Sequence, residues 1–177
     1  MKILLFRGRG LISALIRWQT GSQYSHAAAL VDDTWLYEAW QGKGVRVKRF
    51  DWSDIDNIDF FEIDGLTSEN EARMLEYLKS RVGNKYDYWG VLRFITRGRP
   101  KSNNADFCSE YIYAAAEYTQ LALLARTEPA EVSPGLLGRS PYLSQIPVSF
   151  PSPRWGEGQG EVPPILPISP IPEFSDA

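Results

Sequence analysis

The sequence predicts an α+β fold in which an antiparallel sheet packs against helices. Short apolar or alternating segments fill the first third of the chain, and longer segments with helical spacing follow them. Strands grouped ahead of helices are typical of α+β proteins rather than of parallel α/β folds. At 177 residues, 44% of them hydrophobic, the chain is long enough to bury a core of its own.

The expected strands are recognised by apolar runs or by alternation of apolar and polar residues. The opening "KILLF" is a short apolar run. His26–Val31 ("HAAALV") and Trp35–Ala39 ("WLYEA") flank the turn residues Asp32 and Asp33, which predicts a hairpin. "GVRVKRF" alternates valine with basic residues, and "IDFFEID" follows the turn-rich "DWSDIDN", so each of them predicts a further strand.

Two helices are expected ahead of the segment that holds the cysteine. "GLISALIRWQTG" ends at a plausible stop, Gly21. "TSENEARMLEYLKSRVG" begins with a capping residue, Thr67 or Ser68, and its first turn holds acidic side chains, which suit the positive end of a helix. In the first of these helices the apolar residues near helical spacing are Leu11, Ile12, Leu15, Ile16 and Trp18.

The composition divides the chain into a domain and a tail. One proline, Pro100, precedes Arg126, and the other eleven of the twelve lie from Pro129 onward. We expect a single domain over residues 1–147, of which 127–147 form an ordered extension, and a Pro/Gly-rich tail over 148–177 without a core of its own. The tail segment "PPILPISPIP" could serve as a proline-rich ligand, but a passive tail is the favoured interpretation.

The residue counts argue against several classes of protein. A single cysteine rules out an intrachain disulfide, and one cysteine with one histidine is a poor set for a structural zinc site. The net charge of −3 gives no general attraction to nucleic acid or to anionic membranes. The N-terminal apolar run is too short for a signal peptide, and no run approaches the roughly 18 residues of a membrane helix. We therefore expect a cytoplasmic protein with no membrane span, metal or cofactor.

The segment "NADFCSEYIYAAAE" contains the cysteine and predicts a helix that begins near it. Cys108 should lie in the first turn, where unpaired N–H groups and the helix dipole favour a thiolate and can bind a developing oxyanion. A cysteine that only packs in the core is the alternative, because free cysteine is among the most buried residue types. The residues that recur at helical spacing are Phe107, Tyr111, Ala114, Ala115, Tyr118 and Leu121.

His26 and Glu38 are the candidate partners of the cysteine. A Cys–His pair can only be formed by Cys108 and His26, the one histidine, which opens an otherwise apolar strand. The predicted hairpin can bring Glu38 near His26, and a third group that orients the imidazole is usual in such sites. Because Glu38 lies among apolar and aromatic residues, its carboxylate needs a partner. An arginine would serve as well as His26, so both pairings stay open.

In order and wording these segments resemble the circularly permuted branch of the NlpC-type, papain-like cysteine peptidases and amidases. That branch includes the YiiX/YaeF-like proteins and phage cell-wall-associated hydrolase relatives, and in it the histidine strand precedes the cysteine helix, as here. The resemblance covers about residues 1–147 and implies a permuted papain-like fold with the cysteine at a helix N-terminus. The matching pieces are "YSHAAALV", "LYEA", the helix followed by "VGNKYDYWG", the "FCSEYIYAA" helix and "VSPGLLGRSPYL".

Residue by residue, the resemblance implies Cys108 as nucleophile, His26 as general base and then acid, and Glu38 as the group that orients the histidine. Tyr86 in "GNKYDY" matches a tyrosine near the site that could help to hold the substrate carbonyl; a buried structural tyrosine explains it equally well. The implied reaction is cleavage of an amide, in a peptide or a muropeptide, through an acyl-enzyme. Acyl transfer or ester hydrolysis on a lipid uses the same intermediate, so acyl substrates stay open.

Two other functions belong to the binding class. The fold could bind a lipid or peptide without catalysis. Arg97-Gly98-Arg99-Pro100 matches the core of an AT-hook, which enters the minor groove of DNA, but the net negative charge disfavours nucleic acid as a partner. A wall substrate would also require delivery to the cell envelope by a phage-type route, since no export signal is recognised, and the oligomeric state stays open.

Overall fold

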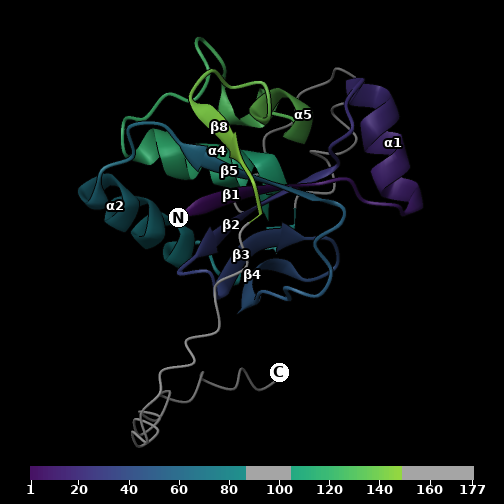
Figure 1. Ribbon diagram of the computed structural model, residues 1–177, viewed down its shortest axis with the longest axis horizontal. Coiled ribbons are helices and arrows are strands. Elements are labelled where there is room, and N and C mark those ends of the chain that lie inside the picture. Colours follow the sequence, from purple (N-terminus) through teal and green to yellow (C-terminus); the bar gives the residue numbers. More distant parts are fainter. Residues whose placement is uncertain (87–104, 149–177) are drawn as a thin grey trace, which may run out of the picture.

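A six-stranded sheet runs through the middle of the protein, whose structure is a computed structural model (Figure 1). The structure describes residues 1–86 and 105–148. Its elements in chain order are β1 (Lys2–Phe6), α1 (Leu11–Thr20), β2 (His26–Val31), β3 (Trp35–Trp40), β4 (Gly44–Arg49), β5 (Ile58–Ile63), α2 (Ser68–Ser80), β6 (Lys85–Tyr86), β7 (Ala105–Asp106), α4 (Cys108–Tyr118), the short 3₁₀ helix η1 (Pro129–Glu131), α5 (Pro134–Leu137) and β8 (Leu143–Ile146).

The sheet has the strand order β4-β3-β2-β1-β5-β8, and each neighbouring pair is antiparallel. β6 and β7 form a separate parallel pair. The α+β prediction is therefore confirmed, and the strands expected in the first third of the chain are all present. β3 runs one residue farther than expected, to Trp40.

The turn between β2 and β3 sets the register of the hairpin. Asp32 and Asp33 both have positive φ, 51° and 50°, and a turn of this hand matches the twist of the flanking strands. The Thr34 N–H donates to Val31 O at 3.0 Å and closes the turn. The resulting register pairs Ala29 with Tyr37. Continued along the hairpin, it brings the start of β2 to the end of β3.

Each face of the sheet buries its own apolar cluster, which explains why β2 is apolar along almost its whole length. On one face, Ala27 and Ala29 belong to the cluster that includes α4, and their small side chains let the helix approach closely. On the other face, the connection from β4 to β5 supplies Phe50 and Trp52 as a cover. The buried residues beneath that cover are Leu4, Ala28, Leu30, Leu36, Ile58 and Phe60.

α4 is buried on nearly all sides, because the sheet covers one side and α2, η1 and α5 cover others. The residues whose helical spacing predicted this helix therefore make up only part of its buried surface. Tyr118 is largely exposed, and the helix ends there, before Leu121. Tyr113, which was not among those residues, is fully buried, and its hydroxyl donates to Leu124 O at 3.1 Å. The other buried residues after the first turn are Tyr111, Ile112, Ala115 and Ala116.

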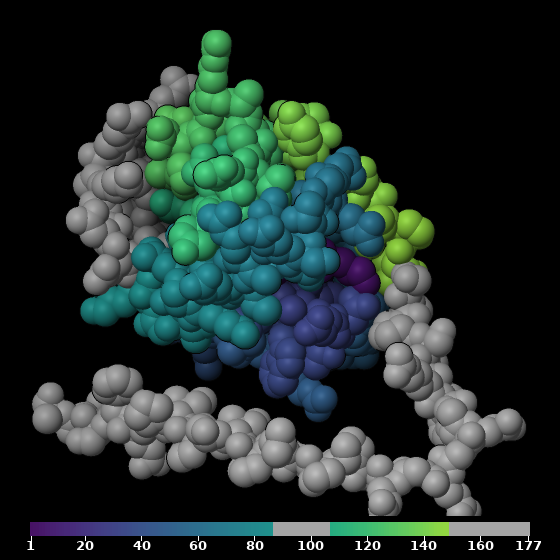
Figure 2. All heavy atoms as spheres, turned by 90° about the vertical axis from the view of Figure 1, so that its left-hand side faces the viewer, coloured from purple at the N-terminus to yellow at the C-terminus, as the bar shows by residue number. Residues whose placement is uncertain are grey.

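α2 begins as the sequence predicts. The Thr67 side chain accepts a hydrogen bond from the Asn70 N–H at 3.2 Å, which identifies Thr67 as the cap. Met74 and Leu78 are buried on the side of the helix that packs against α4. The amino group of Met1 pairs with Glu71, so the start of β1 is fastened to α2. Viewed from the α2 side, the purple N-terminal end reaches the surface above the β-hairpin (Figure 2).

The segment after residue 126 adds η1, α5 and β8 to the domain. Leu137 and Leu143 are buried, and β8 extends the sheet by pairing with β5. The sequence analysis did not recognise β8, because four residues without clear alternation carry little strand signal. The tail expected for 148–177 lies outside the described residues, apart from residue 148, and its boundary stays a prediction.

In Figure 1, α1 lies to the right of the sheet and α2 lies to the left. Gly21 ends the helix in the left-handed conformation, with φ of 58°, as the sequence predicts. Of the five apolar residues that predicted the helix, only Ile16 is buried. Leu11 and Trp18 are 92% and 76% exposed. The helix is therefore present, but its apolar face is not a core face.

β4 begins at a glycine that approaches another backbone segment closely. Gly44 has φ of 74°, and a Cβ at this position would lie 2.2 Å from Asn84 O, in the turn after α2. The next residue, Val45, donates its N–H to the same oxygen at 2.8 Å. The absence of a side chain at residue 44 thus lets β4 bond to the turn that leads into β6.

We expect Gly44→Ala to lower the free energy of unfolding more than Gly21→Ala. Both glycines have positive φ, so alanine costs about 1–2 kcal/mol at either position. Only at Gly44 does the new Cβ meet backbone atoms, which adds about 1–3 kcal/mol of overpacking. Urea denaturation of the two variants measures the difference, and equal losses would contradict the close approach of β4 to Asn84.

Candidate active site

Cys108 is the first residue of α4 and is 1% exposed. Phe107 precedes it in an extended conformation, and the first backbone bond of the helix runs from the Tyr111 N–H to Phe107 O at 2.9 Å. The N–H groups of Cys108 and Ser109 therefore precede the hydrogen-bond ladder of the helix. The Ser109 hydroxyl donates to Val132 O, which anchors the first turn. The predicted place of the cysteine at a helix N-terminus is confirmed.

His26 and Glu38 lie on neighbouring strands and are hydrogen-bonded. His26 opens β2, and Glu38 lies in β3, where it is 1% exposed. His26 Nε2 and Glu38 Oε2 are 2.9 Å apart. The structure thus brings these two candidate residues together.

Glu38 is also bound by an arginine, so the two pairings that the sequence left open occur together. Arg46 stands opposite Glu38 in the register of β3 and β4, and its Nε and Nη2 donate to Glu38 Oε1 at 3.0 and 2.7 Å. Lys48 Nζ lies 3.7 Å from the same oxygen. One carboxylate oxygen therefore faces the imidazole, and the other faces the cations.

Arg46 and Lys48 are site residues that the sequence analysis missed. The alternation in "GVRVKRF" places the two on one face of β4, which is the signal that could have found them. The missing information was the register of β4 against β3, which determines whether that face meets Glu38.

The imidazole of His26 lies between two aromatic rings. Phe6 pairs with His26 across β1 and β2, and their ring centroids are 5.1 Å apart. Trp40, at the end of β3, meets the imidazole edge to face, also at 5.1 Å. The Arg46 guanidinium lies over the Trp40 ring, 5.0 Å from its centroid. Arg46 therefore supports His26 by two routes, through Glu38 and through Trp40.

The pKa values of His26 and Glu38 are displaced in opposite directions. Burial alone would raise the pKa of Glu38, but a hydrogen bond and the charge of His26, followed by Arg46 and Lys48, lower it to about 2. Burial alone would lower the pKa of His26, but the charge of Cys108, a hydrogen bond with its side chain and the interactions with Glu38 raise it to about 9. His26 thus connects Cys108 to Glu38.

Tyr86, on β6, lies beside the start of the cysteine helix. Its ring centroid is 6.2 Å from that of Phe107, the residue before Cys108, and the three residues belong to one buried cluster. This place fits the neighbourhood that the sequence predicted for Tyr86. Its role toward a substrate carbonyl stays a prediction.

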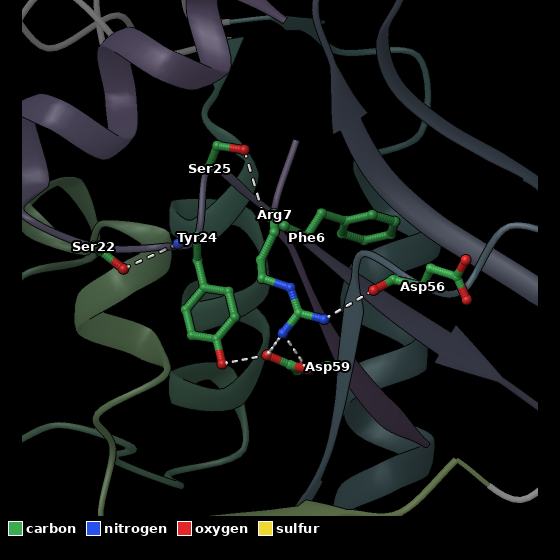
Figure 3. A network of polar contacts seen from close by, with 7 residues as sticks. All are labelled: Phe6, Arg7, Ser22, Tyr24, Ser25, Asp56 and Asp59. Atoms are coloured by element: carbon green, nitrogen blue, oxygen red, sulfur yellow. Dashed lines mark hydrogen bonds and ion pairs between the residues drawn. The ribbon is translucent and has the colours of Figure 1, made fainter. Parts of the chain in front are cut away.

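A buried carboxylate on β5 holds the segment that leads into His26. Asp59 accepts hydrogen bonds from Arg7 Nη1, at 2.7 Å to each carboxylate oxygen, and from the Tyr24 hydroxyl at 2.7 Å. Arg7 also donates from Nη2 to Asp56 O at 3.0 Å. Figure 3 shows the guanidinium enclosed by these groups. Arg7 directly follows β1, and Tyr24 lies two residues before His26. Asp59 therefore anchors both ends of the connection between β1 and β2, which contains α1.

Three of the expectations concern metals, membranes and DNA. Among residues 1–86 and 105–148, no three His, Cys, Asp or Glu side chains gather where they could hold a metal ion. No helix in these ranges has the length and apolar content to cross a bilayer. The Arg97–Pro100 segment considered for DNA binding lies outside the described residues.

Comparison with known proteins bears on the fold. No family model and no curated protein matches the sequence. Among solved structures, the chain is similar to the crystal structure of the metalloprotein yiiX from Escherichia coli O157:H7, a DUF1105 protein. The match covers 85% of this chain and 97% of that chain, with a TM-score of 0.59 and 18% sequence identity. This chain has the yiiX fold. The resemblance to the permuted NlpC-type, papain-like branch is thereby confirmed for the fold.

We expect the imidazole of His26 to titrate with a midpoint near 9 in wild-type protein. His26 is the only histidine, so NMR of the untagged chain follows it without overlap from another histidine. In Cys108→Ala the midpoint should fall well below 9, because burial still lowers the pKa and the main opposing interactions are gone. Glu38→Gln should lower it as well. A wild-type midpoint near 6.5 would contradict the Cys–His–Glu connection.

We expect Arg46→Ala to lower the free energy of unfolding by about 3 kcal/mol at pH 7, because it leaves a buried carboxylate without its closest cation. The folded pKa of Glu38, about 2, lies below its ordinary value, so ionised Glu38 contributes stability that is lost as pH falls through this range. The deficit of the variant should therefore shrink in acid. Denaturation series at several pH values measure this.

The matched control for that variant is Arg49→Ala, on the same strand. Arg49 is exposed and stands opposite Trp35 rather than Glu38. Its replacement should change stability by no more than about 0.5 kcal/mol. Equal effects of the two substitutions would show that the Arg46–Glu38 contact contributes nothing of its own.

Proposed function

We propose that this protein is a papain-like cysteine hydrolase that cleaves an amide bond in a peptide or a peptidoglycan-type peptide. The observation that carries the proposal is the connection of Cys108, at the N-terminus of α4, to His26 and through it to Glu38. The yiiX-like fold supports a papain-like hydrolase family. The amide substrate is inferred from the sequence resemblance.

In the proposed first half-reaction, His26 holds the proton of the Cys108 thiol, which accords with the high pKa of the imidazole. The thiolate sulfur attacks the carbonyl carbon, and the carbonyl π electrons move onto oxygen. Backbone N–H groups at the start of α4, including that of Cys108, stabilise the oxyanion. As the C–N bond breaks, the His26 imidazolium gives its proton to the leaving amine, and a thioester remains on Cys108.

In the second half-reaction, water attacks the thioester and His26 removes the proton from that water. The C–S bond breaks, the acid is released, and the thiolate is again paired with the imidazolium. Glu38, with a pKa of about 2, stays ionised throughout and stabilises the imidazolium that forms twice in the cycle. Arg46 keeps Glu38 turned so that Oε2 faces the imidazole.

The fold relative yiiX is described as a metalloprotein, and His26 and Glu38 are residue types that can bind a metal ion. They do not fit this role. Arg46 binds one carboxylate oxygen of Glu38, and His26 binds the other, so both oxygens are already occupied by hydrogen bonds.

Acyl transfer is the second candidate function, because an acceptor nucleophile could replace water at the thioester. The two functions share the acylation step and the same three residues. They differ in what resolves the acyl-enzyme, so product analysis distinguishes them.

We expect iodoacetamide to alkylate Cys108 at pH 6 at least tenfold faster in wild type than in His26→Ala. Deprotonation of the thiol at this pH depends on the imidazole as proton acceptor, and only thiolate reacts. Glu38→Gln should show an intermediate rate, and Arg49→Ala the wild-type rate. The chain has one cysteine, so mass spectrometry reports this site alone. Equal rates in wild type and His26→Ala would refute the proposed dyad.

A panel of peptides, muropeptides and acyl esters then tests the reaction. We expect release of amine from an amide substrate by wild type and none by Cys108→Ala. Turnover of esters alone, or transfer to an added acceptor, would replace the amidase proposal with the second function. Tyr86→Phe is informative on the same panel: an unchanged kcat would assign the Tyr86 hydroxyl a structural role only.

A further inference from the structure

α1 turns its apolar side to solvent and its polar side to the body of the protein. Leu11 and Trp18 are among the most exposed large apolar side chains of the described residues, and Leu15 is also exposed. Because successive residues of a helix are rotated by about 100°, these three lie on one face. On the opposite side Ile16 is buried and Ser13 is half-buried. A helix that packs on a core has the reverse arrangement.

The chain before and after α1 is tied down, so this exposure does not result from a frayed segment. Arg7, ahead of the helix, and Tyr24, behind it, both bond to Asp59 of β5 (Figure 3). The Ser25 N–H donates to Phe6 O at 2.9 Å, which joins the two ends of the excursion to each other.

α5 holds the turn that follows the helix. A Cβ at Gly135 would lie 2.2 Å from the Ser22 Cβ, so these two segments are in close contact. Since the flanking segments are attached to β5, β1 and α5, the apolar face of α1 is presented outward in a defined orientation.

The sequence segment that contains α1 is basic, although the chain as a whole is negative. Residues 1–31 contain four basic side chains and no acidic ones. Lys2 pairs with Asp33 and Arg7 with Asp59. Within the described ranges, Arg9 and Arg17 have no carboxylate partner: Arg9 bonds to the Asn57 side chain, and Arg17 Nε is buried without a hydrogen bond. Arg9 lies just before α1, and Arg17 lies within the helix and is partly buried.

We propose that α1 docks the protein on a lipid bilayer with anionic headgroups. Leu11, Leu15 and Trp18 enter the boundary between headgroups and acyl chains, and Arg9, just before the helix, interacts with lipid phosphates. An exposed apolar face that includes tryptophan, combined with arginines and no acidic residue, is the composition of helices that lie in a membrane interface.

The local charge favours a membrane over a second copy of this chain. In a symmetric pair formed through α1, the cations of one copy would approach the same cations of the other. No carboxylate within residues 1–31 is available to neutralise them. On a bilayer the same cations meet anions. The surface requires no catalysis by Cys108, so it can be tested apart from the proposed reaction.

The test is co-sedimentation of the full chain with phosphatidylcholine vesicles that contain or lack phosphatidylglycerol. We expect binding to the anionic vesicles that weakens as salt is added, and little binding to the neutral ones. Leu11→Glu and Trp18→Glu should each reduce binding at least tenfold. Arg9→Gln should reduce binding to the anionic vesicles severalfold. Val82→Glu is the matched control, because it places the same charge at an exposed apolar position after α2 and should leave binding unchanged.

Several results would overturn the proposal. Wild type that does not bind anionic vesicles is one, and binding that Leu11→Glu and Trp18→Glu leave intact is another. A dimer in sedimentation experiments that Leu11→Glu dissociates, without vesicle binding, would assign the face to a second copy. A loss of thermal stability in Leu11→Glu, again without vesicle binding, would show that another part of this chain covers α1.

Discussion

The buried carboxylate of Glu38 is the interaction on which the arrangement of the site depends. A charge with 1% exposure is costly unless it is paired and hydrogen-bonded, and Glu38 is satisfied by groups from two neighbouring strands. β2 supplies His26 and β4 supplies Arg46. A slip of one residue in either strand pairing would move that partner to the other face of the sheet. The same register therefore satisfies the charge and assembles the site.

Asp59 performs a comparable task on the other side of β1. It accepts from Arg7 and from Tyr24, which lie at the two ends of the excursion that contains α1. The consequence differs from that at Glu38, because the partner of Glu38 is a histidine that can exchange a proton, whereas a guanidinium stays charged. In the proposed reaction Glu38 stabilises the imidazolium of His26, while Asp59 orients a segment of the backbone. That segment contains α1 and leads into His26, so Asp59 helps to fix the position of both.

Much of the fold could be predicted because local patterns were strong. Alternation and apolar runs located β1 to β5, and Thr67 and Gly21 marked helix ends by their capping chemistry. Cys108 could be placed at a helix start from the apolar spacing that follows it. β8 could not be recognised, because it is short and is stabilised mainly by its pairing with β5.

The small number of cysteines and histidines also predicted the Cys–His pair of the candidate site. With one cysteine and one histidine, a Cys–His pair in this chain has a single possible composition. The partners of the Glu38 carboxylate were harder to predict, because a sequence shows that a buried charge needs a partner but not how many partners it has. The structure gives Glu38 both of the partners that were considered, a histidine and an arginine, one for each carboxylate oxygen.

The sequence by itself determined which residues share a strand or helix, which side chains share a face, and which cysteine and histidine are available. The tertiary structure decided what each face meets. The apolar residues of α1 have the spacing of a core helix, yet they face solvent because Asp59 and α5 hold the flanking chain in place. Arg46 meets Glu38 because β4 pairs with β3 in one register. The physical reason is that periodicity is set by the local backbone, whereas the direction of a face depends on contacts between residues far apart in the chain.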